Sequence, residues 1–239
     1  MRSILAIFLL ALLPAAPVAA GTATTGSVTQ HGVELAATRF GSSLVARADL
    51  SASASYGPFR VIDAATAALV DVTDDQSPGA FLAMLREHPH IATLAFLECP
   101  GTYDDRANLA LGRMIRSAGL AVWVPEGGSV RSGAVELVLA GVSLRIEDGA
   151  EFAVHAWLDE DGYQAGDYAA DSPENRRYLT YYREMGLSAE TAAAFYAMTN
   201  SVPFDDTRWL DGSEMRGWIG IEPSAEPRLA YLDLSPALN

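Results

Sequence analysis

Short apolar runs and longer helical patterns alternate along most of the chain. Apolar runs typical of buried strands recur at 59–62, 67–72, 93–99, 121–124 and 151–157. Between and after them, apolar residues recur with the helical period and predict helices over 77–88, 106–118, 134–140, 173–185, 189–198 and from 212. Strands that alternate with helices are typical of α/β proteins with parallel strands, so the sequence predicts a single α/β domain.

Helix boundaries carry recognisable capping signals. Ser77-Pro78 and Ser172-Pro173 each place a serine cap before a proline at the first helical position. Ser188 precedes a further helix, and Asp211–Glu214 has the spacing of a capping box. Gly119 follows the helix predicted over 106–118 and provides its C-terminal stop.

The first residues have the pattern of a cleavable signal peptide. Arg2 is the basic region, 4–13 the apolar region, and Val18-Ala19-Ala20 the small-residue cleavage site. The apolar run is too short to span a membrane. We therefore expect residues 1–20 to be removed on export to the periplasm.

The pattern of regular elements begins after this leader. Residues 21–56 are rich in Ser, Thr, Ala and Gly, and they predict a loosely ordered segment in which 33–37 is a candidate edge strand. The α/β domain is expected over 57–234, with 228–232 as a final edge strand.

Charge excludes several classes of partner. The chain has 16 basic and 30 acidic residues and a formal net charge of −14. Such a surface repels nucleic acid and anionic lipid, so neither is an expected partner. Every basic residue is arginine, and the absence of lysine excludes a Ser–Lys dyad and a Schiff base.

The cysteine and the histidines predict neither a disulfide nor a metal site. Cys99 is the single cysteine and ends an apolar strand, where we expect it to be a buried small residue. The four histidines are scattered, and none belongs to a cluster with zinc spacing. The sequence thus predicts no metal and no cofactor.

One serine and one histidine are placed as a hydrolase would need them. Ser132 follows a Gly-rich approach and opens an apolar helix, while His155 lies in the strand after a hairpin predicted at Asp148-Gly149. A nucleophilic serine requires such a base to take its proton. Both residues also have a structural interpretation, because serine is a common helix cap and a lone histidine on an apolar strand is often a core residue.

Around these residues the chain resembles the Clp-protease/crotonase superfamily, and within it the exported Clp-like proteins of bacteria, over roughly 58–220. The resemblance rests on the turn Cys99–Thr102, the helix 110–116, Ser132 before a helix that ends in Leu-Ala-Gly, and His155; the segments 181–186 and 208–214 are also similar. It implies a ClpP/crotonase-like repeated ββα superhelix in one domain.

The resemblance also assigns roles to individual residues. It implies that Ser132 is the nucleophile, that His155 is its base, and that the backbone N–H groups of Thr102 and Gly133 form the oxyanion hole. The family has a glycine at the position of Thr102, and threonine adopts a positive φ angle only at a cost.

The third triad member and the role of one glutamate stay open at this point. The resemblance places the triad aspartate at Asp205 or Asp206. Glu136 lies four residues after Ser132, and helical spacing puts both on one face. A carboxylate there would either act as an acid or base or disturb the pocket.

The sequence leaves three functions to compare. The first is a periplasmic serine hydrolase, peptidase-like, that takes a peptide or a small ester or amide. The second is a catalytically lapsed Clp-like domain used for binding or assembly, and the third an acyl-CoA enzyme, which the negative charge and the export signal disfavour. Relatives on this fold form trimers, hexamers or heptameric rings, so a homo-oligomer is also implied.

Overall fold

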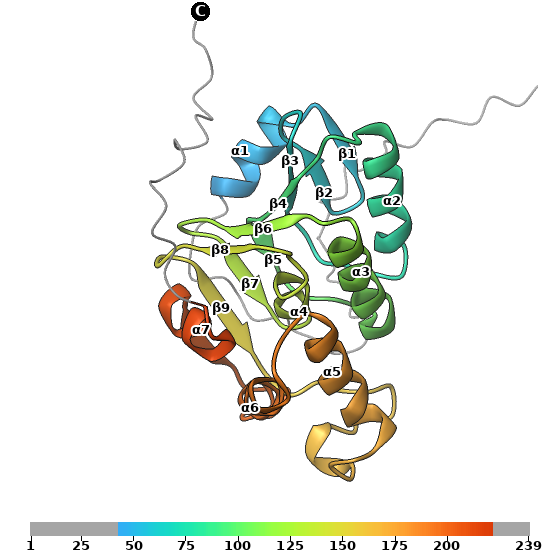
Figure 1. The fold of residues 1–239 in the computed structure, drawn as a ribbon, viewed down its shortest axis with the longest axis vertical. Helices are drawn as coiled ribbons and strands as arrows, with labels where there is room; N and C mark the ends of the chain where they lie inside the picture. Colours follow the sequence, from blue (N-terminus) through green and yellow to red (C-terminus); the bar gives the residue numbers. More distant parts are fainter. Residues whose placement is uncertain (1–42, 222–239) are drawn as a thin grey trace, which may run out of the picture. The chain divides into compact units, whose positions relative to one another are not determined.

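The computed structural model describes residues 43–221 (Figure 1). The predicted signal peptide 1–20 and the edge strands predicted at 33–37 and 228–232 lie outside the described residues. Within 43–221, no helix is both long enough and apolar enough to cross a membrane.

The described elements follow one another as α1 (Ser43–Ser51), β1 (Ala54–Tyr56), β2 (Phe59–Val61), β3 (Thr66–Leu69), α2 (Ser77–Glu87), β4 (Thr93–Phe96), β5 (Glu98–Cys99), α3 (Asp105–Ser117), β6 (Ala121–Val124), β7 (Ser129–Arg131), α4 (Ala134–Val138), β8 (Leu144–Ile146), β9 (Glu151–Val154), the 3₁₀ helix η1 (Ala165–Asp167), α5 (Pro173–Glu184), α6 (Ala189–Thr199), β10 (Arg208–Asp211) and α7 (Gly212–Ile219).

The strands form two sheets, and from β4 to β9 successive strands belong alternately to one sheet and the other. The larger sheet has the order β1-β2-β3-β4-β6-β8, and the smaller has the order β10-β9-β7-β5. Strands β3, β4, β6 and β8 are parallel, as are β5, β7 and β9. The units β4-β5-α3 and β6-β7-α4 therefore repeat one step, and β8-β9 begins the next. This confirms the predicted α/β domain built as a repeated ββα superhelix.

Two sequence predictions are wrong because each ββ step changes sheets. The run 93–99 forms β4 in the larger sheet and β5 in the smaller sheet, not one strand. Likewise, Asp148-Gly149 is not a hairpin turn, since β8 pairs with β6 while β9 pairs with β7 and β10. The apolar pattern indicates that these strand segments are buried. It does not indicate that the chain passes from one sheet to the other between them.

Alternate residues of the larger sheet face two separate apolar clusters. Ala67 and Leu69 belong to the main core, whereas Ala68 and Val70 belong to a small cluster with Ala48 of α1. Successive side chains of a strand point to opposite faces. In Figure 1, α1 accordingly lies on one side of this sheet and α2 and α3 lie on the other.

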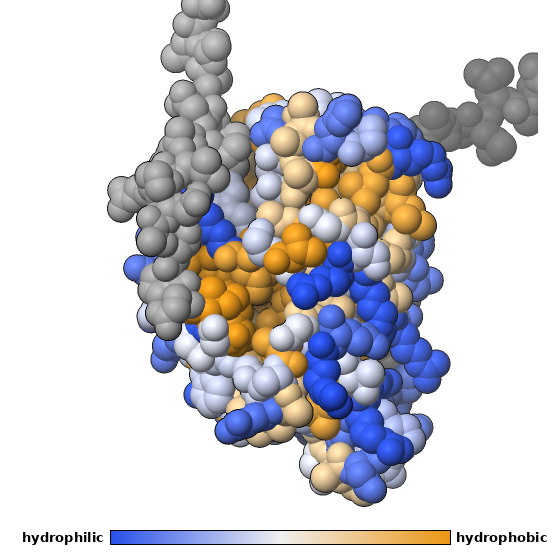
Figure 2. All heavy atoms as spheres, in the orientation of Figure 1, coloured by the Kyte–Doolittle hydropathy of each residue, from blue (hydrophilic) through white to orange (hydrophobic). Residues whose placement is uncertain are grey.

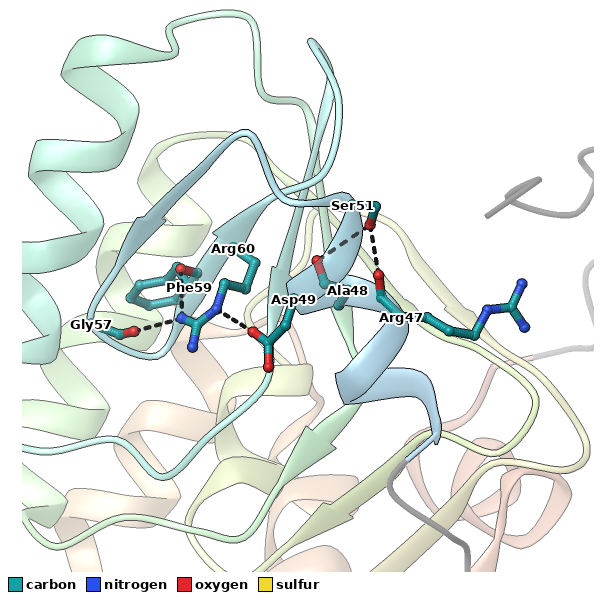
Figure 3. Close-up of polar contacts among 7 residues, drawn as sticks. All are labelled: Arg47, Ala48, Asp49, Ser51, Gly57, Phe59 and Arg60. Atoms are coloured by element: carbon teal, nitrogen blue, oxygen red, sulfur yellow. Dashed lines mark hydrogen bonds and ion pairs between the residues drawn. The ribbon is translucent and has the colours of Figure 1, made fainter. Parts of the chain in front are cut away.

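The segment predicted to be loosely ordered up to residue 56 differs in the structure, which forms α1 and β1 there. Arg60 of β2 holds α1 by donating to Asp49 at 2.7 Å, and it also donates to the carbonyl of Gly57 at 2.8 Å (Figure 3). This ion pair and the burial of Ala48 attach α1 to the larger sheet. The composition of the segment did not predict this helix.

Most predicted capping sites are confirmed, with one exception. The side chains of Ser172 and Ser188 accept bonds from the third residue of their helices, and Asp211 forms a capping box with Glu214. Ser77 is not an N-cap, because α2 starts at Ser77 itself and the serine hydroxyl donates to Asp74 at 2.8 Å.

The C-terminal part of the described chain closes the smaller sheet. Strand β10, which was not predicted, pairs antiparallel with β9 and makes the edge of that sheet. Helix α7 follows directly, and its buried Arg216 donates to the carbonyl of Ile146 at 2.6 Å. The absence of a side chain at Gly212 allows the start of α7 to lie close to Glu147, since a Cβ there would lie 1.9 Å from the Glu147 carbonyl oxygen.

Candidate functional site

Ser132 has an unusual backbone conformation at the junction between β7 and α4. Its φ angle is 50°, and among residues 43–221 no other non-glycine residue has a positive φ. Its N–H donates to the carbonyl of Ala153 at 2.8 Å, which extends the β7–β9 pairing to the serine. Left-handed backbone is costly for a residue with a side chain and concentrates at functional sites.

Ser132 is not the cap of the following helix. The N-cap of α4 is Gly133, with φ −57°, and no side chain makes a capping hydrogen bond there. The structural interpretation of this serine as a helix cap is therefore wrong. The strained conformation needs another explanation.

The neighbouring turn is packed closely against Gly133. A Cβ at Gly133 would lie 2.4 Å from Cγ2 of Thr102, and Asn108 donates to the carbonyl of Gly133 at 2.6 Å. Thr102 itself pairs with Thr73 in an isolated bridge and does not have a positive φ. Within the described residues, neither the Thr102 N–H nor the Gly133 N–H donates a hydrogen bond.

His155 lies immediately after the last residue of β9. Its Nδ1 is 2.9 Å from the carbonyl oxygen of Ala156, and the ring meets the ring of Phe204 edge-on with centroids 4.9 Å apart. Because a carbonyl only accepts, Nδ1 is the donor in this bond, which leaves Nε2 as the acceptor of the neutral ring. No hydrogen bond in the described chain joins His155 to Ser132.

The two aspartates predicted for the triad do not contact this histidine. Asp205 and Asp206 are exposed, and Asp206 accepts a hydrogen bond from the N–H of Thr207 at 2.7 Å. Within residues 43–221, neither makes a hydrogen bond or ion pair with His155. Phe204 of the same loop is the residue that reaches the imidazole.

Asp105 is the carboxylate that the structure brings into this environment. It begins α3, and the hydroxyl of Tyr178 donates to its Oδ2 at 2.6 Å. Burial raises the pKa of Asp105, while the Tyr178 hydrogen bond and the charges of Arg177 and His155 oppose that rise. In the sequence, the one indication of a role for Asp105 was its position as an acidic residue at a helix start, soon after the Cys99–Thr102 turn.

Glu136 is buried in α4 and is held by two tyrosines of α5. The hydroxyl of Tyr182 donates to Oε1 at 2.9 Å, and that of Tyr181 donates to the backbone carbonyl at 2.8 Å. Burial, with a contribution from Asp105, raises the pKa of Glu136 to about 8. No hydrogen bond of the described chain joins it to Ser132, so its structural partners are the tyrosines.

Aromatic rings from α5, α6 and the segment after β9 form a stack. Trp157 lies 5.9 Å from Tyr178 between ring centroids, and Tyr178 lies 5.8 Å from Tyr196. The indole N–H of Trp157 donates to the hydroxyl of Tyr196 at 2.7 Å, and that hydroxyl donates to Asn175 at 2.5 Å. These bonds fix the orientation of the Trp157 ring two residues beyond His155.

Two cavities in the described part of the chain lie near the C-terminal helices. One of about 310 Å³ is lined mostly by apolar residues of the α4–β8 connection, the α5–α6 connection and α7, and Figure 2 shows an apolar hollow on this face. The other, of about 410 Å³, lies between η1, α5 and α6. Neither is lined by Ser132 or His155. No group of three or more His, Cys, Asp or Glu within 43–221 is arranged to hold a metal.

Comparisons with known proteins give a remote likeness in structure and none in sequence. No protein-family model matches the chain, and no curated protein matches it. Among solved structures, a mutant of the membrane-bound stomatin-specific protease 1510-N, in complex with a substrate peptide, is 15% identical over 64% of this chain and 74% of that chain, with a TM-score of 0.40. A likeness at this level carries no argument about activity, so function is inferred from the site itself.

Proposed function

We propose that this chain is an exported serine hydrolase, peptidase-like, in which Ser132 is the nucleophile and His155 its base. The observation that supports the proposal is the φ angle of 50° at Ser132. A serine with only a structural role at a strand–helix junction would need neither this strain nor the adjacent glycine. In hydrolases, a sharp strand-to-helix turn exposes the nucleophilic oxygen to a substrate.

The chemistry follows from the free groups around the serine. As Oγ of Ser132 attacks a carbonyl carbon, its proton passes to Nε2 of His155, and the Nδ1–H bond to Ala156 keeps the imidazole in the required tautomer. The carbonyl oxygen becomes an oxyanion, which the N–H groups of Thr102 and Gly133 are proposed to stabilise. Collapse of the intermediate expels the leaving group, which takes the proton from His155.

Asp105 replaces Asp205 and Asp206 as the proposed supporting carboxylate. It interacts electrostatically with His155 and would favour the imidazolium that forms during attack. Ser132 and His155 share no hydrogen bond in the free protein, so their contact has to form when substrate binds. Catalytic hydrogen bonds are often long without substrate and shorten in the complex.

Labelling of the signal-free protein with a fluorophosphonate probe tests the proposal. We expect labelling of wild type, its loss in Ser132→Ala and His155→Ala, and its retention in Ser143→Ala, which removes an exposed loop serine. Asp105→Asn should slow labelling without abolishing it. Labelling that survives in Ser132→Ala would refute the assignment of the nucleophile.

A second candidate function is a catalytically lapsed domain that serves in binding or assembly. It is favoured by the close packing of Thr102 against Gly133 and by the missing hydrogen bond between Ser132 and His155. A well-folded wild type that is never labelled, even at high probe concentration, would support this alternative. Replacement of Thr102 by glycine, as at the family position, would then be the variant to test for recovered labelling.

A further inference from the structure

Arg177 of α5 is a half-buried cation without a polar partner. Its guanidinium lies over the rings of Trp157 and Tyr178, 5.4 and 5.2 Å from their centroids, and its Nε is buried without a hydrogen bond. In the described chain, no hydrogen bond or ion pair engages this guanidinium. The Nε of Arg131 is also buried without a hydrogen bond, but Arg131 and Arg216 differ from Arg177 because an Nη group of each donates a hydrogen bond at 2.6 Å.

This lack of a partner is unexpected in so acidic a chain. Acidic residues outnumber arginines by 30 to 16, yet none of those within residues 43–221 forms a hydrogen bond or ion pair with Arg177. A guanidinium has five N–H donors, and the one on Nε is buried here without an acceptor, which is unfavourable. The aromatic faces offset part of that cost through cation–π attraction, but they accept no hydrogen bond in the guanidinium plane.

The stack also holds the guanidinium within electrostatic reach of Asp105, the proposed supporting carboxylate. Trp157 follows His155 by two residues, and its ring is oriented by the bond to Tyr196. Asp105 interacts electrostatically with both Arg177 and His155, but its hydrogen bond comes from Tyr178, so it forms no ion pair with the arginine. Unlike the buried Nε, the Nη donors of Arg177 therefore stay available to a ligand.

We propose that Arg177 binds a carboxylate of the ligand at this site, through the paired N–H groups of its guanidinium. Carboxylates match that planar fork, and charge-assisted pairs are the stronger hydrogen bonds. The substrates of the enzyme are then esters or amides that carry a free carboxylate, such as a peptide with its C-terminus or an acidic side chain. This substrate class rests on the proposed hydrolase function, whereas carboxylate binding by Arg177 does not.

Binding of a matched pair of small ligands tests the inference. Hippurate carries a carboxylate, and hippuramide replaces it with a neutral amide. Each is titrated into the signal-free protein and followed by calorimetry and by tryptophan fluorescence, to which Trp157 contributes as one of four tryptophans. The same titrations use Ser132→Ala, Arg177→Gln, Arg177→Lys and, as matched control, Arg176→Gln, which removes an exposed neighbouring arginine. Circular dichroism verifies that each variant is folded.

We expect hippurate to bind wild type, Ser132→Ala and Arg176→Gln alike, and hippuramide to bind much more weakly. Arg177→Gln should weaken hippurate binding about tenfold or more, and Arg177→Lys, which keeps the charge without the fork, should also weaken it. Equal binding of the two ligands, no binding of hippurate to wild type, or wild-type affinity in both Arg177 variants would overturn the inference.

The two proposals can fail separately. Hippurate binding without fluorophosphonate labelling would leave the carboxylate site intact and refute the hydrolase. Fluorophosphonate labelling without a preference for hippurate over hippuramide would refute the carboxylate site and leave the hydrolase proposal intact. If both hold, 4-nitrophenyl hydrogen succinate should be hydrolysed faster than 4-nitrophenyl butyrate, and Arg177→Gln should remove the difference.

Discussion

Replacement of Glu136 by glutamine should make the domain more stable at high pH. Glu136 is 8% exposed as a residue, and its carboxyl group accepts a hydrogen bond from Tyr182 at 2.9 Å. Burial raises its pKa from the ordinary 4.5 to about 8. Glutamine has nearly the same shape and keeps an oxygen for the tyrosine hydroxyl, but it has no proton to lose.

The sign and size of the effect follow from proton linkage. Between pH 4.5 and 8 the folded chain retains a proton that the unfolded chain has released, so the free energy of unfolding falls as pH rises. A pKa difference of this size corresponds to a loss of about 5 kcal/mol at most. The loss is complete only above pH 8, and it should be absent from Glu136→Gln. The two proteins should therefore have similar stability near pH 4.5 and diverge above it.

Urea unfolding followed by circular dichroism from pH 5 to 9 measures this difference. Glu160→Gln is the matched control, because it removes the same charge from an exposed loop position and should follow the wild-type pH profile. The reasoning would be refuted by a wild type and a Glu136→Gln variant whose free energies of unfolding change with pH in parallel. It would equally fail if the control removed the pH dependence.

Three further predictions concern the same region. Ser132→Gly should raise the free energy of unfolding by about 1 kcal/mol, because glycine adopts the φ of 50° freely, and should abolish labelling; a Gly variant less stable than Ser132→Ala in urea would contradict this. Gly133→Ala should destabilise the domain by more than about 1 kcal/mol, since its Cβ would lie 2.4 Å from Cγ2 of Thr102. Thr102→Ser should recover most of that loss in a double-mutant cycle, whereas Gly79→Ala, whose Cβ meets no atom within 4 Å, should not destabilise. The thiol of Cys99 is buried with a raised pKa, so it should react with iodoacetamide only after unfolding; equal rates for folded and unfolded protein would show that it is accessible.

The regular elements were largely predictable because their signals are local. Apolar runs and helical periods located most strands and helices, and the caps at Ser172, Ser188 and Asp211 appear in the structure as predicted. Side-chain caps act within one helical turn, so nearby residues suffice to specify them. Ser77 shows the limit, because its hydroxyl bonds Asp74 before the helix and does not cap α2.

The arrangement of strands was not predictable in the same way. The run 93–99 contains no glycine or proline that would mark a break, although it forms strands of two sheets, and β10 was not recognised as a strand that pairs with β9. Burial on both faces looks alike in either sheet, so the pattern does not say which partner a strand has. Helix α1 was missed for a related reason, since it depends on contacts with the larger sheet and not on its own composition.

For the site, the sequence by itself determined which residues can carry chemistry. It supplied a serine before an apolar helix, one histidine in a predicted strand, and no lysine or cysteine pair as a rival. Only the tertiary structure decided the backbone strain at Ser132 and the carboxylate near His155. Asp105 and Tyr178 are 73 residues apart, and Arg177 lies on Trp157 of a different element. Charge and burial at such positions depend on neighbours that are distant in sequence, and these are set only when the chain folds.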